Sequence, residues 1–140
     1  MTRHAKMILA ALGLLLMAGL WRFNLTPAKA AAAFNTLTVT TTSDGPLPLP
    51  GSLRQAINDA APGDTINFVL SGCPCIITLT EGALTINKPL TIQGPGARQL
   101  TITGNNASRV FRSNLPPAAT LTLAGLTIAQ GHTQGNGAGG

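Results

Sequence analysis

The sequence has few aromatic and few charged residues. Aromatic residues make up 4% of its 140 residues, tyrosine is absent, and charged residues make up 9%. A low aromatic content is common in disordered chains, but β-branched residues recur regularly here, which favours a folded β protein. No basic run with interleaved aromatic residues follows residue 30, so we expect no nucleic-acid partner.

Cysteine is also scarce. The two cysteines are Cys73 and Cys75, separated by Pro74. Two ligands are too few for a structural zinc site, which needs four, and we expect neither a metal nor a cofactor. Two interpretations of the pair stay open. The cysteines form a local or intermolecular disulfide, which an oxidising compartment permits, or they are small buried hydrophobic residues.

The residue types that catalysis needs do not form a recognisable site, so we expect no catalytic residues. Glycoside hydrolysis needs two positioned carboxylates, and no two acidic residues after residue 30 share a motif. These acidic residues are Asp44, Asp59, Asp64 and Glu81. His132 is the one histidine after residue 30, and it lies in a glycine-rich segment without an identifiable partner for general-base catalysis.

The first 30 residues have the pattern of a removable signal peptide. Arg3, His4 and Lys6 form a positive segment, residues 7–21 are almost wholly apolar, and residues 28–30 read Ala-Lys-Ala, which fits signal-peptidase cleavage. The apolar run is shorter than the roughly 20 residues that span a bilayer. The alternative is an uncleaved anchor helix. We expect a secreted or cell-surface protein that meets the membrane only during export.

The basic charge of the chain lies mainly in this leader. The formal net charge of the whole chain is +5, whereas five basic and four acidic residues follow residue 30 and leave +1. Basic charge therefore gives no support for nucleic-acid binding. Two interpretations of Lys88, Arg98, Arg109 and Arg112 stay open: a surface for an acidic polysaccharide, or a solvated outer face.

One helix is predicted after the leader, over residues 52–61. Residues 35–42 alternate apolar residues with threonine, which predicts a strand, and the prolines of residues 43–50 predict a loop. Ser52 can cap the helix, and Gln55 can reach back to the Ser52 N–H to close a capping box. Apolar residues recur with a helical period and give one apolar face, namely Leu53, Ala56, Ile57 and Ala60.

From residue 65 onward the apolar residues recur every second position. A three-residue phrase of Leu, Thr and Leu or Ile begins at Leu84, Leu90, Leu100, Leu121 and Leu126. In a strand its two aliphatic residues point to one face and its threonine to the other. Such short strands cannot hold a sheet alone, but they can stack on equivalent strands of neighbouring coils. The sequence predicts an all-β, parallel β-helix, and an antiparallel sandwich is the competing fold.

The repeats leave the stacking order open and suggest one surface. The strongest internal match joins residues 84–94 with residues 121–131, with glycines at the expected bends, but the spacing of the phrases is not constant. Stacked rows of the outward threonines would present regular hydroxyls to a carbohydrate or to ordered water, although strand propensity alone also explains them. These threonines are Thr85, Thr91, Thr101, Thr122 and Thr127.

Residues 51–57, read with the repeated phrases, resemble the CSLREA-type N-terminal region of exported bacterial right-handed parallel β-helix proteins, which have the pectin-lyase-like fold. The matching residues are Ser52, Leu53, Arg54, Ala56 and Ile57. The segments that begin at Thr65, Ile77, Leu90 and Leu100 are similar as well. Gly51 stands at the usual cysteine position, which removes a possible disulfide partner for Cys73 or Cys75, and Gln55 replaces the usual glutamate.

The resemblance implies a right-handed β-helix whose short helix covers the first coil. Two interpretations of Arg54 stay open: a buried or edge-covering charge, or a solvated helix charge. The resemblance also implies secretion or surface display. We expect a structural, display or adhesion function, with a carbohydrate or another cell surface as partner. The alternative is the N-terminal fragment of a polysaccharide-active β-helix lyase or hydrolase. We expect a leader at 1–30, the cap and first coils at 31–131 and a glycine-rich tail at 132–140. The tail offers no cap for the last coil, so the chain is either a truncated piece of a longer β-helix, which we favour, or ends in a frayed coil.

Overall fold

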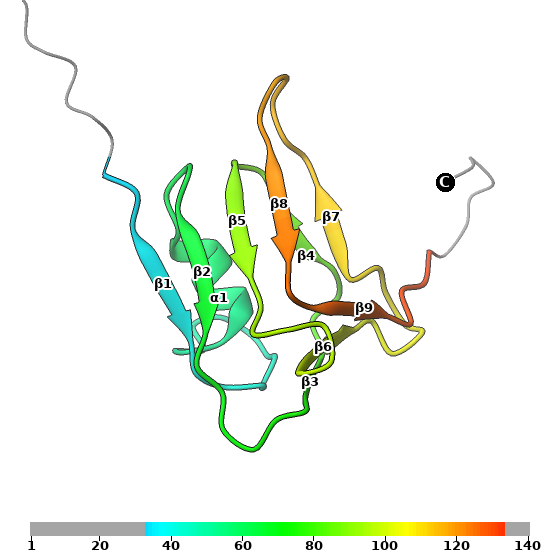
Figure 1. Cartoon of the computed structure of the whole chain (residues 1–140). Coiled ribbons are helices and arrows are strands. Elements are labelled where there is room, and N and C mark those ends of the chain that lie inside the picture. Colours follow the sequence, from blue (N-terminus) through cyan, green and yellow to red (C-terminus); the bar gives the residue numbers. More distant parts are fainter. Residues whose placement is uncertain (1–32, 134–140) are drawn as a thin grey trace, which may run out of the picture. The chain divides into compact units, whose positions relative to one another are not determined.

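The computed structural model describes residues 33–133, so the predicted leader and most of the glycine-rich tail lie outside the described range. The described part is mostly β structure with one short helix (Figure 1). No helix among the described residues is long and apolar enough to cross a membrane. In chain order the elements are β1 (Thr36–Val39), α1 (Leu53–Asp59), β2 (Thr65–Phe68), β3 (Cys75–Thr78), β4 (Leu84–Ile86), β5 (Leu90–Gln93), β6 (Leu100–Thr103), β7 (Phe111–Ser113), β8 (Leu121–Ala124) and β9 (Thr127–Ala129).

The strands form a parallel β-solenoid. Sheet A has the order β1-β2-β5-β8, sheet B has β3-β6-β9, and sheet C has β4-β7. The first coil consists of β2, β3 and β4, and the second coil, β5, β6 and β7, stacks on it strand by strand (Figure 1). The third coil contains β8 and β9, and β1 pairs with β2 on the other side of the first coil. Every described strand pair is parallel, which confirms the parallel fold and excludes the antiparallel sandwich for this part of the chain.

The register explains why the repeated phrases are unevenly spaced. Thr65 pairs with Thr91, 26 positions later, whereas Leu90 pairs with Leu121, 31 positions later. The longer interval contains the loop between β7 and β8. The internal match of residues 84–94 with residues 121–131 does not correspond to stacked strands. Leu121 of β8 pairs with Leu90 of β5, and not with Leu84 of β4.

The aliphatic residues of the phrases point inward and stack in columns. In sheet A, Ile66 pairs with Ile92, and both are 0% exposed. In sheet B, Ile77 pairs with Ile102, which pairs in turn with Ile128. The predicted inward orientation holds for these positions, but Ile128 is 50% exposed, since β9 is the last described strand of sheet B.

The short helix packs against the first coil, as predicted. Leu53, Ile57 and Ala60 are buried in the same hydrophobic cluster as the inward strand residues, and α1 contacts β1 and β4. The helix ends at Asp59, two residues before the predicted end, because Ala60 has an extended ψ of 142°. The N–H of Ala60 still donates to the Ala56 carbonyl, which is the last hydrogen bond of the helix.

The cap of the helix differs from the prediction in one bond. Ser52 Oγ accepts a hydrogen bond from the Gln55 N–H at 3.1 Å, as an N-cap does. The predicted reach of Gln55 back to the Ser52 N–H is wrong, because that N–H donates to the Leu49 carbonyl at 3.2 Å. Gln55 Oε1 instead accepts from the Leu49 N–H at 3.2 Å, and thereby ties the preceding loop to the helix.

Glycines occupy a stacked corner between the second and third coils. A Cβ on Gly94 would lie 2.2 Å from the Gly125 carbonyl oxygen, so the two backbones approach too closely for any side chain. Gly125 also has φ +63°, a conformation that disfavours residues with a Cβ. Both glycines lie between strands of different sheets, which confirms the glycine bends predicted within residues 84–94 and 121–131.

Candidate functional site

A row of four threonines runs across the outward face of sheet A. We call Thr36, Thr65, Thr91 and Thr122 the threonine ladder, because each is the register partner of the next. Neighbouring strands lie about 4.8 Å apart, so the hydroxyl groups repeat at about that spacing. The other outward column of the sheet contains Thr38, Asn67, Gln93 and Ala124, so this face carries no charge at any register position.

The five outward threonines of the repeated phrases supply only part of this ladder. Of these five, Thr91 and Thr122 stack in sheet A, Thr101 and Thr127 stack in sheet B, and Thr85 stands alone in sheet C. They therefore form two stacked pairs on different sheets and not a single row. The ladder is completed by two threonines that the repeated phrase does not include, Thr36 and Thr65. In the sequence, these two threonines could have been recognised as outward residues because each precedes an apolar residue of an alternating strand, Leu37 or Ile66.

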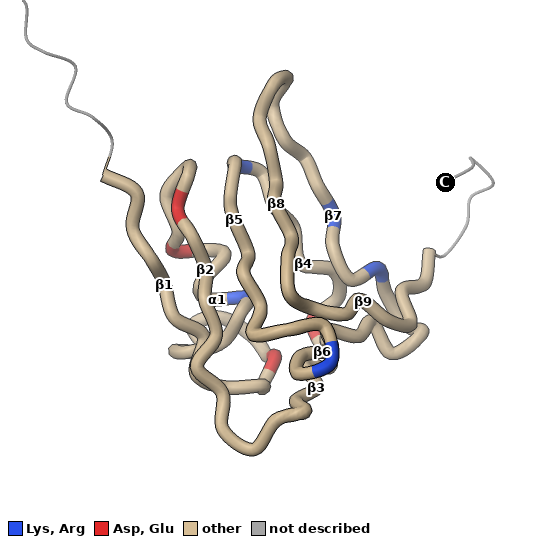
Figure 2. The backbone as a smooth tube through the Cα atoms, in the orientation of Figure 1, with Lys and Arg blue, Asp and Glu red and all other residues tan. Residues whose placement is uncertain are grey.

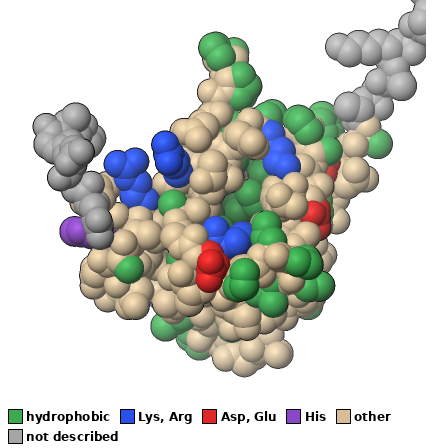
Figure 3. Space-filling view, turned by 180° about the vertical axis from the view of Figure 1, so that it is seen from behind, with side chains coloured by type: hydrophobic (Ala, Val, Ile, Leu, Met, Phe, Trp, Pro, Cys, Tyr) green, Lys and Arg blue, Asp and Glu red, His purple; other side chains and the backbone are tan. Residues whose placement is uncertain are grey.

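A second feature is a cleft of about 390 Å³ between α1 and β4, which we call the α1–β4 cleft. It opens on the side of the molecule that faces the viewer in Figure 3, where basic side chains gather around a hollow. Its wall combines polar and basic side chains with an apolar base. The lining residues are Leu47, Arg54, Ile57, Asn58, Ala83, Leu84, Thr85, Asn87 and Lys88.

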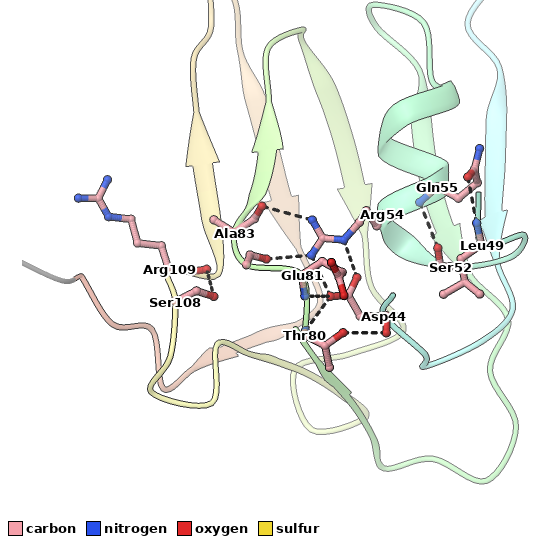
Figure 4. A network of polar contacts seen from close by, with 11 residues as sticks. Asp44, Leu49, Ser52, Arg54, Gln55, Thr80, Glu81, Ala83, Ser108 and Arg109 are labelled. Carbon is pink, nitrogen blue, oxygen red and sulfur yellow. Dashed lines mark hydrogen bonds and ion pairs between the residues drawn. The ribbon is translucent and has the colours of Figure 1, made fainter. Parts of the chain in front are cut away.

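Arg54 reaches from α1 toward the loop before β4 and is held there by a dense set of hydrogen bonds (Figure 4). Its Nε and Nη2 donate to the two carboxylate oxygens of Asp44 at 2.7 and 2.8 Å, and Nη2 also donates to the Gly82 carbonyl at 2.8 Å. Its side chain is 14% exposed. Arg54 is thus not a solvated helix charge, and it ties the helix to two segments distant in sequence.

Asp44 is the centre of this network. Its carboxylate also accepts from the backbone N–H groups of Thr80 at 2.8 Å and Glu81 at 3.2 Å, and its side chain is 2% exposed. Burial alone would raise the pKa of Asp44, but the hydrogen bonds from Arg54, Thr80 and Glu81 and the charge of Arg54 together lower it. Asp44 is therefore ionised at neutral pH and fastens the loop of residues 43–50 to the first coil.

Lys88 lies at the other end of the cleft, beside the C-terminus of α1. Its ammonium group donates to the carbonyl oxygens of Asn58 and Ala60. A cation is favourable at this end of a helix because the free carbonyl groups carry partial negative charge. Within residues 33–133 the one ion pair joins Arg54 and Asp44, so the charge of Lys88 is not balanced by a carboxylate.

Asp59 and Asp64 form structural hydrogen bonds. Asp64 accepts from the Ala61 and Asn35 N–H groups, each at 2.8 Å, and so joins the turn after α1 to the chain before β1. Asp59 accepts from the side-chain amide of Gln55. In the described part of the chain, no three Asp, Glu, His or Cys residues lie close enough together to hold a metal ion.

The two cysteines are joined to each other. A disulfide links Cys73 with Cys75 across the turn that leads into β3, and Cys75 is 8% exposed and packs in the core. His132 is exposed, and its backbone N–H donates to the Ser108 carbonyl at 2.9 Å. Neither the disulfide nor His132 lines the α1–β4 cleft.

Two surface features thus distinguish this solenoid: an uncharged hydroxyl ladder on sheet A and a basic cleft beside β4. The resemblance to the CSLREA-type region remains a prediction. No family model, no curated protein and no solved structure matches this chain.

Proposed function

We propose that this chain is an exported cell-surface β-helix protein, or the helix-capped first part of one, that serves in display or adhesion. In this proposal the threonine ladder on sheet A contacts a neutral carbohydrate. The ladder is the observation that carries the proposal, because four register-paired hydroxyls on an uncharged face form a regular polar surface.

The chemistry of the ladder suits sugar hydroxyls. Each threonine hydroxyl has one donor hydrogen and two acceptor lone pairs, which matches the donor and acceptor character of a sugar hydroxyl. Threonine is stiff at χ1 because it is β-branched, so little side-chain entropy is lost on binding. Each contact is weak, and affinity would come from several contacts along one polymer.

The proposed fold assignment goes further than the parallel solenoid itself. We assign the coils a right-handed path, because connections between parallel strands of one sheet are right-handed in about 98% of cases. We also assign the first coil to the CSLREA-type region. This assignment is supported by the contacts of α1 with β1 and β4 and by the Ser52 cap.

Export has its own test. The leader pattern and the Cys73–Cys75 disulfide both suit an oxidising compartment outside the cytosol. Expression of the full chain in a secreting bacterial host should give an exported product whose N-terminus begins after Ala30. Mass spectrometry of the product measures this, and a product that keeps its first 30 residues would contradict the cleavage.

Carbohydrate binding is tested on a panel of immobilised neutral polysaccharides. The double variant Thr65→Val, Thr91→Val keeps the β-branched shape and removes two hydroxyls, and we expect about a tenfold loss of affinity from the two missing hydrogen bonds. Thr101→Val on sheet B is the matched control and should bind like the parent chain.

The proposal fails if the parent chain binds none of the polysaccharides, or if the control loses as much affinity as the double variant. Shortening of a polysaccharide during the assay would point to the polysaccharide-active alternative.

A further inference from the structure

We propose that the α1–β4 cleft binds an anionic unit of an acidic polysaccharide, and that Arg112 on β7 extends this site. This site is separate from the threonine ladder and does not depend on neutral-glycan binding. The ligand chemistry is a sugar that carries a carboxylate or a sulfate ester.

The hydrogen-bond capacity of the two cations in the cleft is not used up. An ammonium group has three N–H donors, and Lys88 uses two of them on the Asn58 and Ala60 carbonyls. A guanidinium has five N–H donors, and the contacts of Arg54 with Asp44, Gly82 and Ala83 use four of them. Each cation therefore keeps one donor for a ligand.

The charge of the cleft is positive. Asp44 balances Arg54, whereas Lys88 has no carboxylate partner within the described residues. An anionic group at Lys88 would gain a charge-assisted hydrogen bond, which is stronger than a bond between neutral groups. The excess charge thus selects for an anionic ligand over a neutral one.

The rest of the lining fits a sugar ring. Thr85, Asn58 and Asn87 supply hydroxyl and amide groups, and Ile57 and Leu84 supply an apolar base. A volume of about 390 Å³ lies within the range of small-ligand sites, which is about 300–1,000 Å³. The sugar hydroxyls can therefore pair with the polar side chains while its C–H faces lie on the aliphatic ones.

Sheet C continues the site beyond the cleft. Thr85 on β4 is the register partner of Arg112 on β7, and strands in a sheet lie about 4.8 Å apart. Arg109 and Arg112 are exposed, and neither forms an ion pair with another residue of the range 33–133. Figure 2 shows basic positions at α1, before β5 and on and before β7. A polymer that enters the cleft can thus pass over Thr85 to a second cation.

A polysaccharide fits this surface better than a membrane or a nucleic acid. Among the exposed large hydrophobic residues, Leu47 is the one that lines the cleft, so no broad apolar face is present to enter a lipid interface. No aromatic side chain lines it either, and single-stranded nucleic acids are bound largely through stacking on aromatic residues.

The test uses the full chain and immobilised polygalacturonate and dextran sulfate, which separate carboxylate from sulfate recognition, with neutral dextran as the uncharged probe. We expect retention on at least one of the two polyanions that weakens as NaCl is added, and no such retention on dextran. Lys88→Gln should lower the affinity about tenfold, and Arg112→Gln severalfold.

Arg98→Gln is the matched control, because it removes the same charge from a turn outside the cleft and sheet C. It should change polyanion affinity less than twofold. Equal losses in Arg98→Gln and Lys88→Gln would mean unspecific attraction and would overturn the proposal, as would equally strong retention of a DNA duplex or an anionic vesicle.

Two further variants separate this site from protein stability and from the threonine ladder. If Lys88→Gln lowers the melting temperature, the exposed pair Thr85→Val and Arg112→Gln carries the test, and unchanged polyanion affinity in both would overturn the proposal. The double variant Thr65→Val, Thr91→Val should keep full polyanion affinity, and a loss there would assign the binding to sheet A.

Discussion

The first and the last described coils of the solenoid contain the same kind of residues and differ in how well they are buried. In the first coil, Ile66 and Ile86 are 0% exposed and Leu84 is 1% exposed. In the last, Leu123 is only partly buried and Ile128 is 50% exposed. The difference shows that an aliphatic residue in a solenoid is buried by the layers on both sides of it, and not by its own phrase.

The first coil has what the last described coil lacks. Helix α1 lies against it with a buried face, and Asp44 and Arg54 fasten the loop and the helix to the segment before β4. In the last coil, neutral contacts such as the bond from Thr103 Oγ1 to Gln130 Oε1 at 2.9 Å attach it to the coil below. We therefore expect substitutions to cost most in the first two coils.

The largest effect on the free energy of unfolding is expected at two stacked isoleucines of sheet B, one buried and one half-exposed. Ile102 is 0% exposed and Ile128, its register partner, is 50% exposed. Ile102→Ala should lower the free energy of unfolding by about 3–4 kcal/mol, because it opens a cavity between packed layers. Ile128→Ala should cost about 1 kcal/mol or less. Urea unfolding of the full chain measures both, and equal costs would break the comparison.

The next effect concerns the corner that joins the second and third coils. In Gly94→Ala the new Cβ would meet the Gly125 carbonyl oxygen at 2.2 Å, so the coils must move apart. We expect a cost of about 2–3 kcal/mol, since overpacking forces backbone shifts. Gly45→Ala is the control, because its Cβ would make an ordinary contact of 3.5 Å with Leu49. A cost for Gly94→Ala no larger than that of the control would show that the third coil is held only loosely.

The third effect depends on pH and belongs to the first coil alone. The pKa of Asp44 is lowered in the folded chain, so its ionised form stabilises the fold. This contribution is complete above the unfolded pKa of about 3.9 and is lost as the pH falls below that value through the lower folded pKa. Asp44→Asn should therefore cost about 2 kcal/mol at pH 7, and less below that pH window.

Thermal or urea unfolding at a series of pH values measures this difference. Asp59→Asn is the control at an exposed position, where we expect a change of about 0.5 kcal/mol or less. If the cost of Asp44→Asn stays constant down to pH 2, then packing and not charge holds the loop to the first coil.

Much of the fold could be predicted from the sequence, because its signals are local. The phrase of two aliphatic residues around a threonine sets strand orientation through a period of two, and Ser52 marks the start of the helix. The stacking order could not be predicted in this way. β7 contains Phe111-Arg112-Ser113 instead of the phrase, and yet Phe111 stacks on Leu84.

The candidate sites were harder to predict because their residues are distant in sequence. Arg54 meets Asp44 ten positions away and Gly82 28 positions away, and no local pattern joins these three. The threonine ladder likewise needs the register of sheet A, since Thr36 and Thr65 lie outside the repeated phrases. The chemistry of each side chain can be read from the sequence, whereas the lengths of the coils decide which side chains meet.

The smallest expected effect concerns the cap of the helix over the first coil. Ser52 is 0% exposed, and its Oγ accepts from the Gln55 N–H at 3.1 Å. Ser52→Ala should cost about 1 kcal/mol, because that N–H loses its acceptor at the start of the helix. Ser43→Ala, at an exposed loop position, is the control and should change the unfolding midpoint very little. If Ser52→Ala is as silent as the control, then the buried face of α1 and the Arg54 network suffice to hold the helix, and the first coil owes its order to packing rather than to the cap.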